Sequence, residues 1–198
     1  MTMRGMLPGV VIVLSAVLGA GVPLHAIGAS VDCREKAKAF LSTPNDRTLR
    51  AVSDAAAEAC WTAISSSEAK RGRLIHSVER GNRWAAQYLA DHLSNLDGGE
   101  LEDSLIALGQ FADRHPERLL VFVKEGHLAD YNLKSAMIMF PLSLGESPGA
   151  QLDALKARRQ RIKGVTRADL AQQKLIALQA IDADVKEMQL IRSRLRKK

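Results

Sequence analysis

His76 and Glu79 form the residue pair that comes nearest to a metal site in this sequence. Because they stand three residues apart, an α-helix would place both side chains on one face, where they could hold a divalent ion. Two ligands do not complete a site, so we predict no metal and no other cofactor. His92 falls in an apolar stripe and is expected to be partly buried and hydrogen-bonded. His115 and His127 are expected at a helix start and in a turn.

Pairs of carboxylates are the second arrangement that could do chemistry, as in glycoside cleavage. They would have to come from Glu100, Glu102 and Asp103, or from Glu117 and Glu125. Acidic residues at the start of a helix are favoured by the helix dipole without any catalytic role. The sequence also lacks a His-Glu-x-x-His motif and a phosphate-binding glycine loop. We therefore predict no catalytic residues.

Cys33 and Cys60 are the two cysteines of the chain. An even pair in an exported protein indicates a disulfide. It would close a loop of about 28 residues and contribute on the order of 3 kcal/mol by restricting the unfolded chain. Two buried free thiols are the alternative. The acidic Asp32 directly before Cys33 differs from the small-residue context of a lipid attachment site.

Trp84 and Tyr88 stand four residues apart and are candidate binding residues, because they could line a ligand groove from one helix face. Aromatic residues at this spacing belong more often to a core. The other candidates are three arginines that could bind an acidic partner, namely Arg158, Arg159 and Arg161.

The basic residues of the chain are concentrated near its C-terminus. Residues 30–150 carry 14 basic and 17 acidic side chains, a net charge of −3, whereas residues 151–198 carry 13 and 5, a net charge of +8. This segment could attract an acidic protein or an anionic envelope surface, or it could complement the acidic body of its own fold. Nucleic acid is not expected, because the segment has no aromatic residue for stacking on bases. We expect a protein partner or self-association.

The first 29 residues have the three parts of a secretory signal peptide. Arg4 is followed by an apolar run from Met6 to about Leu24 and then by small residues at Ala26, Gly28 and Ala29. A mature chain would begin near Ser30. A retained membrane anchor is the weaker interpretation, because prolines and glycines interrupt the apolar run. We predict a periplasmic or secreted protein without a transmembrane helix in its mature part.

The elements that must position these residues are predicted to be helices throughout. Aromatic content is only 4%, so Leu, Ala, Ile and Val must fill most of the core, and this composition as a whole suits helices better than sheets. The pattern predicts helices over about 32–41, 46–64, 68–80, 82–96, 100–114, 116–125 and 128–140, a linker at 141–150, and a basic helical hairpin at 151–163 and 166–195. Thr166 and Asp169 suggest a capping box at the start of the last helix.

The expected fold is all-α, with stacked αα-hairpins in a disulfide-tied domain over 30–140 and a long C-terminal helical hairpin after the linker. The layout resembles a HEAT-type helical array, although no repeat motif identifies that family. Such a stack presents an extended surface. A non-enzymatic interaction protein of the bacterial envelope is therefore the leading hypothesis. The alternatives are an immunity protein against a cell-wall-degrading toxin and a hydrolase whose site is assembled only in the fold.

Overall fold

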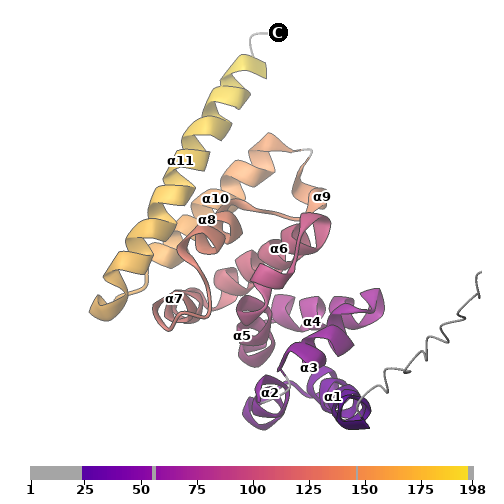
Figure 1. Ribbon diagram of the computed structural model, residues 1–198. Helices are drawn as coiled ribbons and strands as arrows, with labels where there is room; N and C mark the ends of the chain where they lie inside the picture. Colours follow the sequence, from indigo (N-terminus) through magenta and orange to yellow (C-terminus); the bar gives the residue numbers. More distant parts are fainter. Residues whose placement is uncertain (1–23, 55–56, 146, 196–198) are drawn as a thin grey trace, which may run out of the picture.

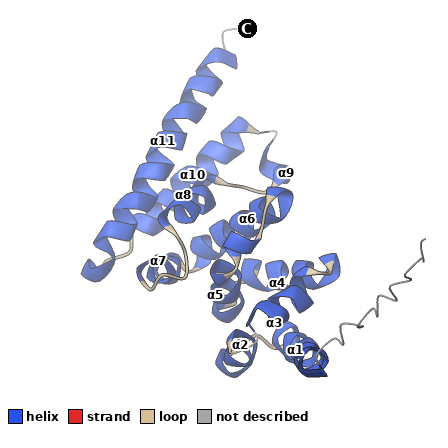
Figure 2. Ribbon diagram, viewed as in Figure 1, coloured by secondary structure: helices blue, strands red, loops and turns tan. Residues whose placement is uncertain are grey.

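The computed structural model describes residues 24–54, 57–145 and 147–195. These residues form eleven α-helices and two short 3-10 helices. Figure 1 shows how the helices are arranged, and Figure 2 shows no strand among the described residues. The prediction of an all-α fold is confirmed, whereas a HEAT-like repeat stays a prediction. None of the helices in these ranges combines the length and the hydropathy that a membrane crossing requires. The predicted signal peptide lies outside the described residues, apart from its last six, which belong to the first helix.

Three helices form the N-terminal layer: α1 (Leu24–Ser42), α2 (Asp46–Ser53) and α3 (Ala57–Ser65). The single helix predicted over 46–64 is wrong, because the backbone of Asp54 turns to an extended conformation and ends α2. Ser and Asp side chains compete with the helical backbone for hydrogen bonds, which favours such an end.

The predicted disulfide is present and joins α1 to α3. The Cα atoms of Cys33 and Cys60 lie 4.7 Å apart, and both side chains are buried. A capping box begins α2, the helix between them, since the Asn45 side chain accepts from the Thr48 backbone N–H and the Thr48 hydroxyl accepts from the Asn45 backbone N–H.

The middle of the molecule is a stack of short helices: α4 (Glu68–Glu79), α5 (Arg83–Asp91), the 3-10 helix η1 (Leu93–Asn95), α6 (Gly98–Arg114), α7 (Pro116–Lys124) and α8 (Asp130–Ile138). The predicted start signals hold at Asn82, whose side chain caps α5, and at Pro116. Gly81 and Gly126 have φ of +89° and +83° at the predicted helix ends. The helix predicted over 82–96 ends early, at Asp91, and Gly98 begins the next helix.

The C-terminal part contains α9 (Leu142–Gly145), α10 (Pro148–Lys163), the 3-10 helix η2 (Ala168–Leu170) and α11 (Ala171–Leu195). The predicted linker over 141–150 thus contains α9 and the start of α10. The predicted capping box at Thr166 is wrong, because Arg167 occupies the N-cap of η2. Asp169 instead binds the side chains of Arg167 and Lys124, which hold the pKa of its carboxyl well below the usual range.

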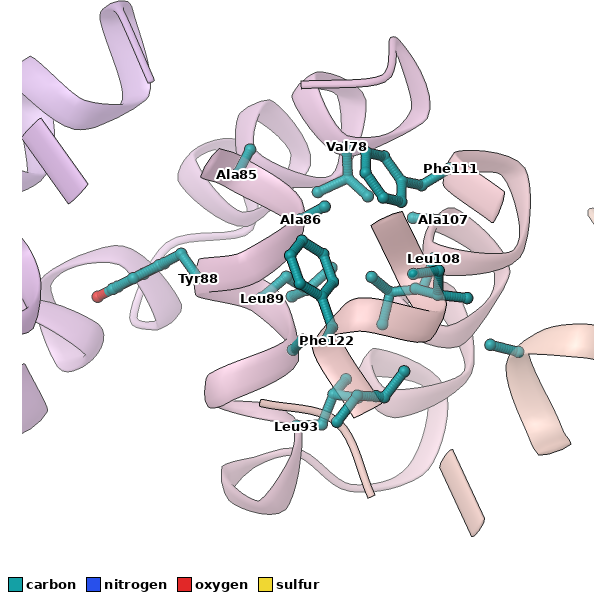
Figure 3. Packing of buried hydrophobic residues seen from close by; sticks show 14 of the residues in the cluster. Val78, Ala85, Ala86, Tyr88, Leu89, Leu93, Ala107, Leu108, Phe111 and Phe122 are labelled. Carbon is teal, nitrogen blue, oxygen red and sulfur yellow. The ribbon is translucent and has the colours of Figure 1, made fainter. Parts of the chain in front are cut away.

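One hydrophobic core runs through all layers, from Cys33 in α1 to Ile181 in α11. At its centre, side chains from α5, α6 and α7 interdigitate, as Figure 3 shows for Leu89, Leu108 and Phe122. The hairpin of α10 and α11 shares this core, because α11 packs along α8 and α10 lies against α6, α7 and α8. The hairpin is therefore docked on the body.

Candidate functional site

Tyr88, a predicted binding residue, is a core side chain. It is fully buried, and its ring centroid lies 4.9 Å from that of Phe40 and 4.4 Å from that of His92. Figure 3 shows it pointing away from Leu89 and toward the N-terminal layer. Its hydroxyl is buried without a hydrogen-bond partner among the described residues. Burial raises the pKa of Tyr88 well above its ordinary value, and the nearby charge of Asp91 adds to this.

Trp84 lies half-buried at the start of α5, where the guanidinium of Arg83 stands 4.1 Å from its ring centroid. Neither Trp84 nor Tyr88 lines the pocket described below. His92 is buried as predicted: its Nδ1 donates to the Tyr88 carbonyl at 2.9 Å, and its ring stacks on Trp61.

The predicted binding residue Arg158 is buried inside the protein, with 1% of its surface exposed. It binds the carboxylate of Asp113 and donates to the carbonyls of Ala136 and Met137 at 3.0 and 2.9 Å. The ring of Phe140 covers its guanidinium, with 4.4 Å between the guanidinium carbon and the ring centroid. Arg158 therefore fastens α10 to α6 and α8 and presents no charge to a partner.

The other two candidate arginines also bind partners within the chain. Arg159 pairs with Asp182 of α11 at 2.5 Å, and Arg161 pairs with Asp113 at 3.3 Å. The structure therefore brings Arg158 and Arg161 together at Asp113 and leaves Arg159 on the seam of the hairpin. Complementarity between the basic hairpin and its own acidic body is the interpretation that these contacts favour.

The hollow that the structure does provide is a pocket of about 680 Å³ between α4 and α6. Its apolar wall contains buried Trp61, Leu74 and Leu89, together with the half-buried Ile75, Leu96 and Ile106. Five carboxylates line the same pocket, and four of these residues are exposed: Glu68, Asp97, Glu100 and Asp103, while Glu79 is half-buried. Arg71 is the one basic residue of the lining, so the five carboxylates and this guanidinium give the pocket lining a net charge of −4. We call this feature the acidic pocket.

Regular helical spacing places the acidic residues on facing surfaces. In α4, Glu68 and Glu79 lie on the same face because they are eleven residues, or about three turns, apart. In α6, Glu100 and Asp103 are three residues apart. Arg71 joins the two helices through an ion pair with Glu100 at 2.8 Å. One edge is formed by Pro141 and Leu142, and the Leu142 residue is 90% exposed.

The chemistry that this arrangement favours is binding of a cationic, partly apolar group. His76 lies 3.7 Å from Glu79, but in the part of the chain that the structure describes no three His, Cys, Asp or Glu residues gather in a way that could hold a metal ion. An apolar wall contacts aliphatic side chains, and surrounding carboxylates attract ammonium or guanidinium groups.

From the sequence, Glu100 and Asp103 are candidates for a catalytic carboxylate pair or acidic residues at a helix start, and not part of a binding pocket. The signal that was missed is that two helices separated by α5 both carry acidic residues at helical spacing. Nothing local in the sequence pairs α4 with α6, so the pocket emerges only from the fold.

The sequence contains a Gly-x-Ser-x-Gly spacing at residues 145–149, which is also the spacing of the nucleophile elbow of α/β-hydrolases. That motif places its serine on a strand-to-helix turn, and the described residues contain no strand. Here the Ser147 side chain accepts a hydrogen bond from the Ala150 backbone and caps α10. The structure therefore gives this serine a role at a helix start.

No protein-family model matches the chain, and no curated protein or solved structure shows significant similarity to it.

Proposed function

We propose that the protein is a non-enzymatic interaction protein, exported from the cytosol, whose acidic pocket binds a cationic amphipathic segment of a protein partner. The observation that carries this proposal is the lining of one pocket by five carboxylates together with partly buried apolar side chains. A peptide segment could bind to both features if it placed a leucine-like side chain against the apolar wall and a lysine or arginine beside the carboxylates.

The size and charge of the pocket support a peptide segment as the occupant. A volume of about 680 Å³ lies in the range of pockets that hold a few side chains or a small ligand. A net charge of −4 repels anionic lipid headgroups and phosphates. The basic hairpin, by contrast, uses its three candidate arginines within the chain. These contacts support the pocket, rather than the three arginines, as the surface that receives the partner.

Export is supported by the sequence of the first 29 residues and by the disulfide between Cys33 and Cys60. Fusion of residues 1–29 to a reporter that is active only in the periplasm would test it. We expect the reporter to be active, and we expect this activity to be lost when charged residues interrupt the apolar run. A reporter that stays in the cytosol would contradict export.

Binding is tested with a fluorescein-labelled peptide of about 12 residues made of leucine and lysine at helical spacing, using fluorescence anisotropy. We expect saturable binding that weakens as ionic strength rises, because surface charge attraction is screened by salt. The double variant Glu79→Lys, Asp103→Lys should weaken binding by about tenfold or more.

The matched control is Glu102→Lys, because Glu102 is exposed on α6 but does not line the pocket. It should change the affinity by less than about twofold. Equal losses in the double variant and the control would mean that the peptide responds to overall charge. That result, or the absence of saturable binding, would reject the pocket as the site.

A further inference from the structure

The C-terminal end of α11 is a helical segment that the body of the protein leaves uncovered. Every side chain from Gln189 to Arg194 is exposed. Two of them are large and apolar, Leu190 at 58% and Ile191 at 36% exposure. Helices in water draw most of their stability from packing of an apolar face. An uncovered end of this composition is a surface suited to a partner.

The end of α11 carries basic and apolar side chains, which are the two kinds of group that the acidic pocket can bind. Residues 189–198 read QLIRSRLRKK and carry five basic side chains and no acidic one. Leu190 and Ile191 are followed by Arg192 and Arg194, and the four-residue spacing places Leu190 and Arg194 on the same helix face. The pocket combines an apolar wall with five carboxylates. Charge and apolar character are therefore complementary between the two surfaces.

The pocket and the end of α11 cannot meet within one chain. Buried Ala177 and Ile181 fix α11 on the core, and Asp182 ties it to Arg159 of α10. Figure 1 shows the free end of α11 pointing away from α4, which forms one side of the pocket. The occupant must come from another molecule.

We infer that the acidic pocket of one molecule binds the end of α11, residues 189–195, of a second copy of the chain. The inference rests on the proposed function of the pocket and names its partner. Two different surfaces meet in this contact, so each dimer keeps one free pocket and one free helix end. Such head-to-tail contacts build rings when the geometry closes and open chains when it does not.

The test is sedimentation velocity on the chain from Ser30 to Lys198, without the apolar leader, over a range of concentrations up to about 0.5 mM, suited to a weak contact of small area. We expect concentration-dependent association that decreases at high salt. The tail variant Arg192→Glu, Arg194→Glu and the pocket variant Glu79→Lys, Asp103→Lys should each be monomeric. Lys134→Glu, an exposed charge on α8, is the control and should associate like the wild type.

An equimolar mixture of the tail variant and the pocket variant distinguishes this contact from general charge attraction. The tail variant retains a normal pocket, and the pocket variant retains a normal tail. One productive contact is then available, so the mixture should form dimers and nothing larger. A mixture that stays monomeric while the wild type associates would overturn the head-to-tail contact.

A synthetic peptide of residues 186–198 provides a measurement that does not depend on folding of the variants. It should dissociate the wild-type assemblies, whereas the same peptide with glutamate at 192 and 194 should not. A wild-type chain that is monomeric at all concentrations but binds the leucine-lysine peptide would reject self-association and leave the proposed function standing. Failure of both peptides to bind would reject both.

Discussion

Arg158 donates two hydrogen bonds to the carboxylate of Asp113, at 3.0 and 2.8 Å, across 45 residues of sequence. The guanidinium is 1% exposed, whereas the Asp113 side chain is 28% exposed. A charge at this depth is tolerated only with a partner and further hydrogen bonds, and the carbonyls of Ala136 and Met137 accept such bonds from Nη1 of Arg158. This contact fixes the position of the hairpin on the body.

Removal of Asp113 should destabilise the protein strongly. Asp113→Ala leaves the buried guanidinium of Arg158 without its counter-charge, and breaking a buried pair in this way typically costs about 3–5 kcal/mol. The value here should lie near the lower limit, because Asp113 is partly exposed. Urea unfolding followed by circular dichroism measures the change. Arg161→Ala removes the exposed partner of the same carboxylate and should cost less than about 1 kcal/mol. Similar losses in both variants would contradict the dominant role of Arg158.

Gly109 should tolerate no side chain. A Cβ atom there would lie 2.5 Å from the Ala136 carbonyl oxygen and 3.1 Å from Nη1 of Arg158. Gly109→Ala would force α6 and α8 apart, and we expect a loss of about 1–3 kcal/mol. Gly72→Ala is the matched control in α4, because nothing lies within 4 Å of its Cβ position. It should stabilise the protein by about 0.5–1 kcal/mol through helix propensity. Thermal unfolding of the two variants should shift in opposite directions.

The helices and their ends could be predicted where the signal is local. The Asn82 cap, the glycines at 81 and 126, and the start at Pro116 follow from backbone chemistry that acts within a few residues. Local signals fail where two of them conflict. At Ser53 and Asp54 the side chains favour a helix end, whereas the apolar periodicity of the sequence continues on both sides and predicts one helix.

The candidate site could not be predicted, because it depends on which helices become neighbours. Arg158 stands in a run of basic residues that is typical of a solvated face, and only the docking of α10 shows that it is buried. Tyr88 was placed on a face of α5 that could line a groove, but the N-terminal layer covers that face. The Cys33–Cys60 pair could be predicted, because cysteine number and helix spacing restrict the choices.

Reduction of the disulfide should weaken the N-terminal layer. Its two cysteines are 27 residues apart in sequence, and a loop of that length corresponds to about 3 kcal/mol of unfolded-state restriction. Urea unfolding of the wild type with and without a thiol reductant measures the loss. Cys33→Ala, Cys60→Ala is the control and should be insensitive to reductant. A wild type with the same midpoint under both conditions would show that the disulfide contributes little.

Tyr88 should make the protein sensitive to alkaline pH. Burial raises the pKa of the Tyr88 hydroxyl in the folded state. Ionisation of Tyr88 therefore does not affect the free energy of unfolding below the ordinary tyrosine pKa of about 10. As the pH rises from there toward the folded-state pKa, the free energy of unfolding falls progressively. At about pH 11 the folded chain should show the tyrosinate absorbance of at most one of its two tyrosines.

Tyr88→Phe removes a buried hydroxyl that has no hydrogen-bond partner among the described residues, and the stability of this variant at neutral pH should be unchanged or raised by about 1 kcal/mol. The variant should also lose the additional alkaline destabilisation, and wild-type and variant pH profiles that run parallel above pH 10 would show that Tyr88 ionises as easily in the folded chain as in the unfolded one.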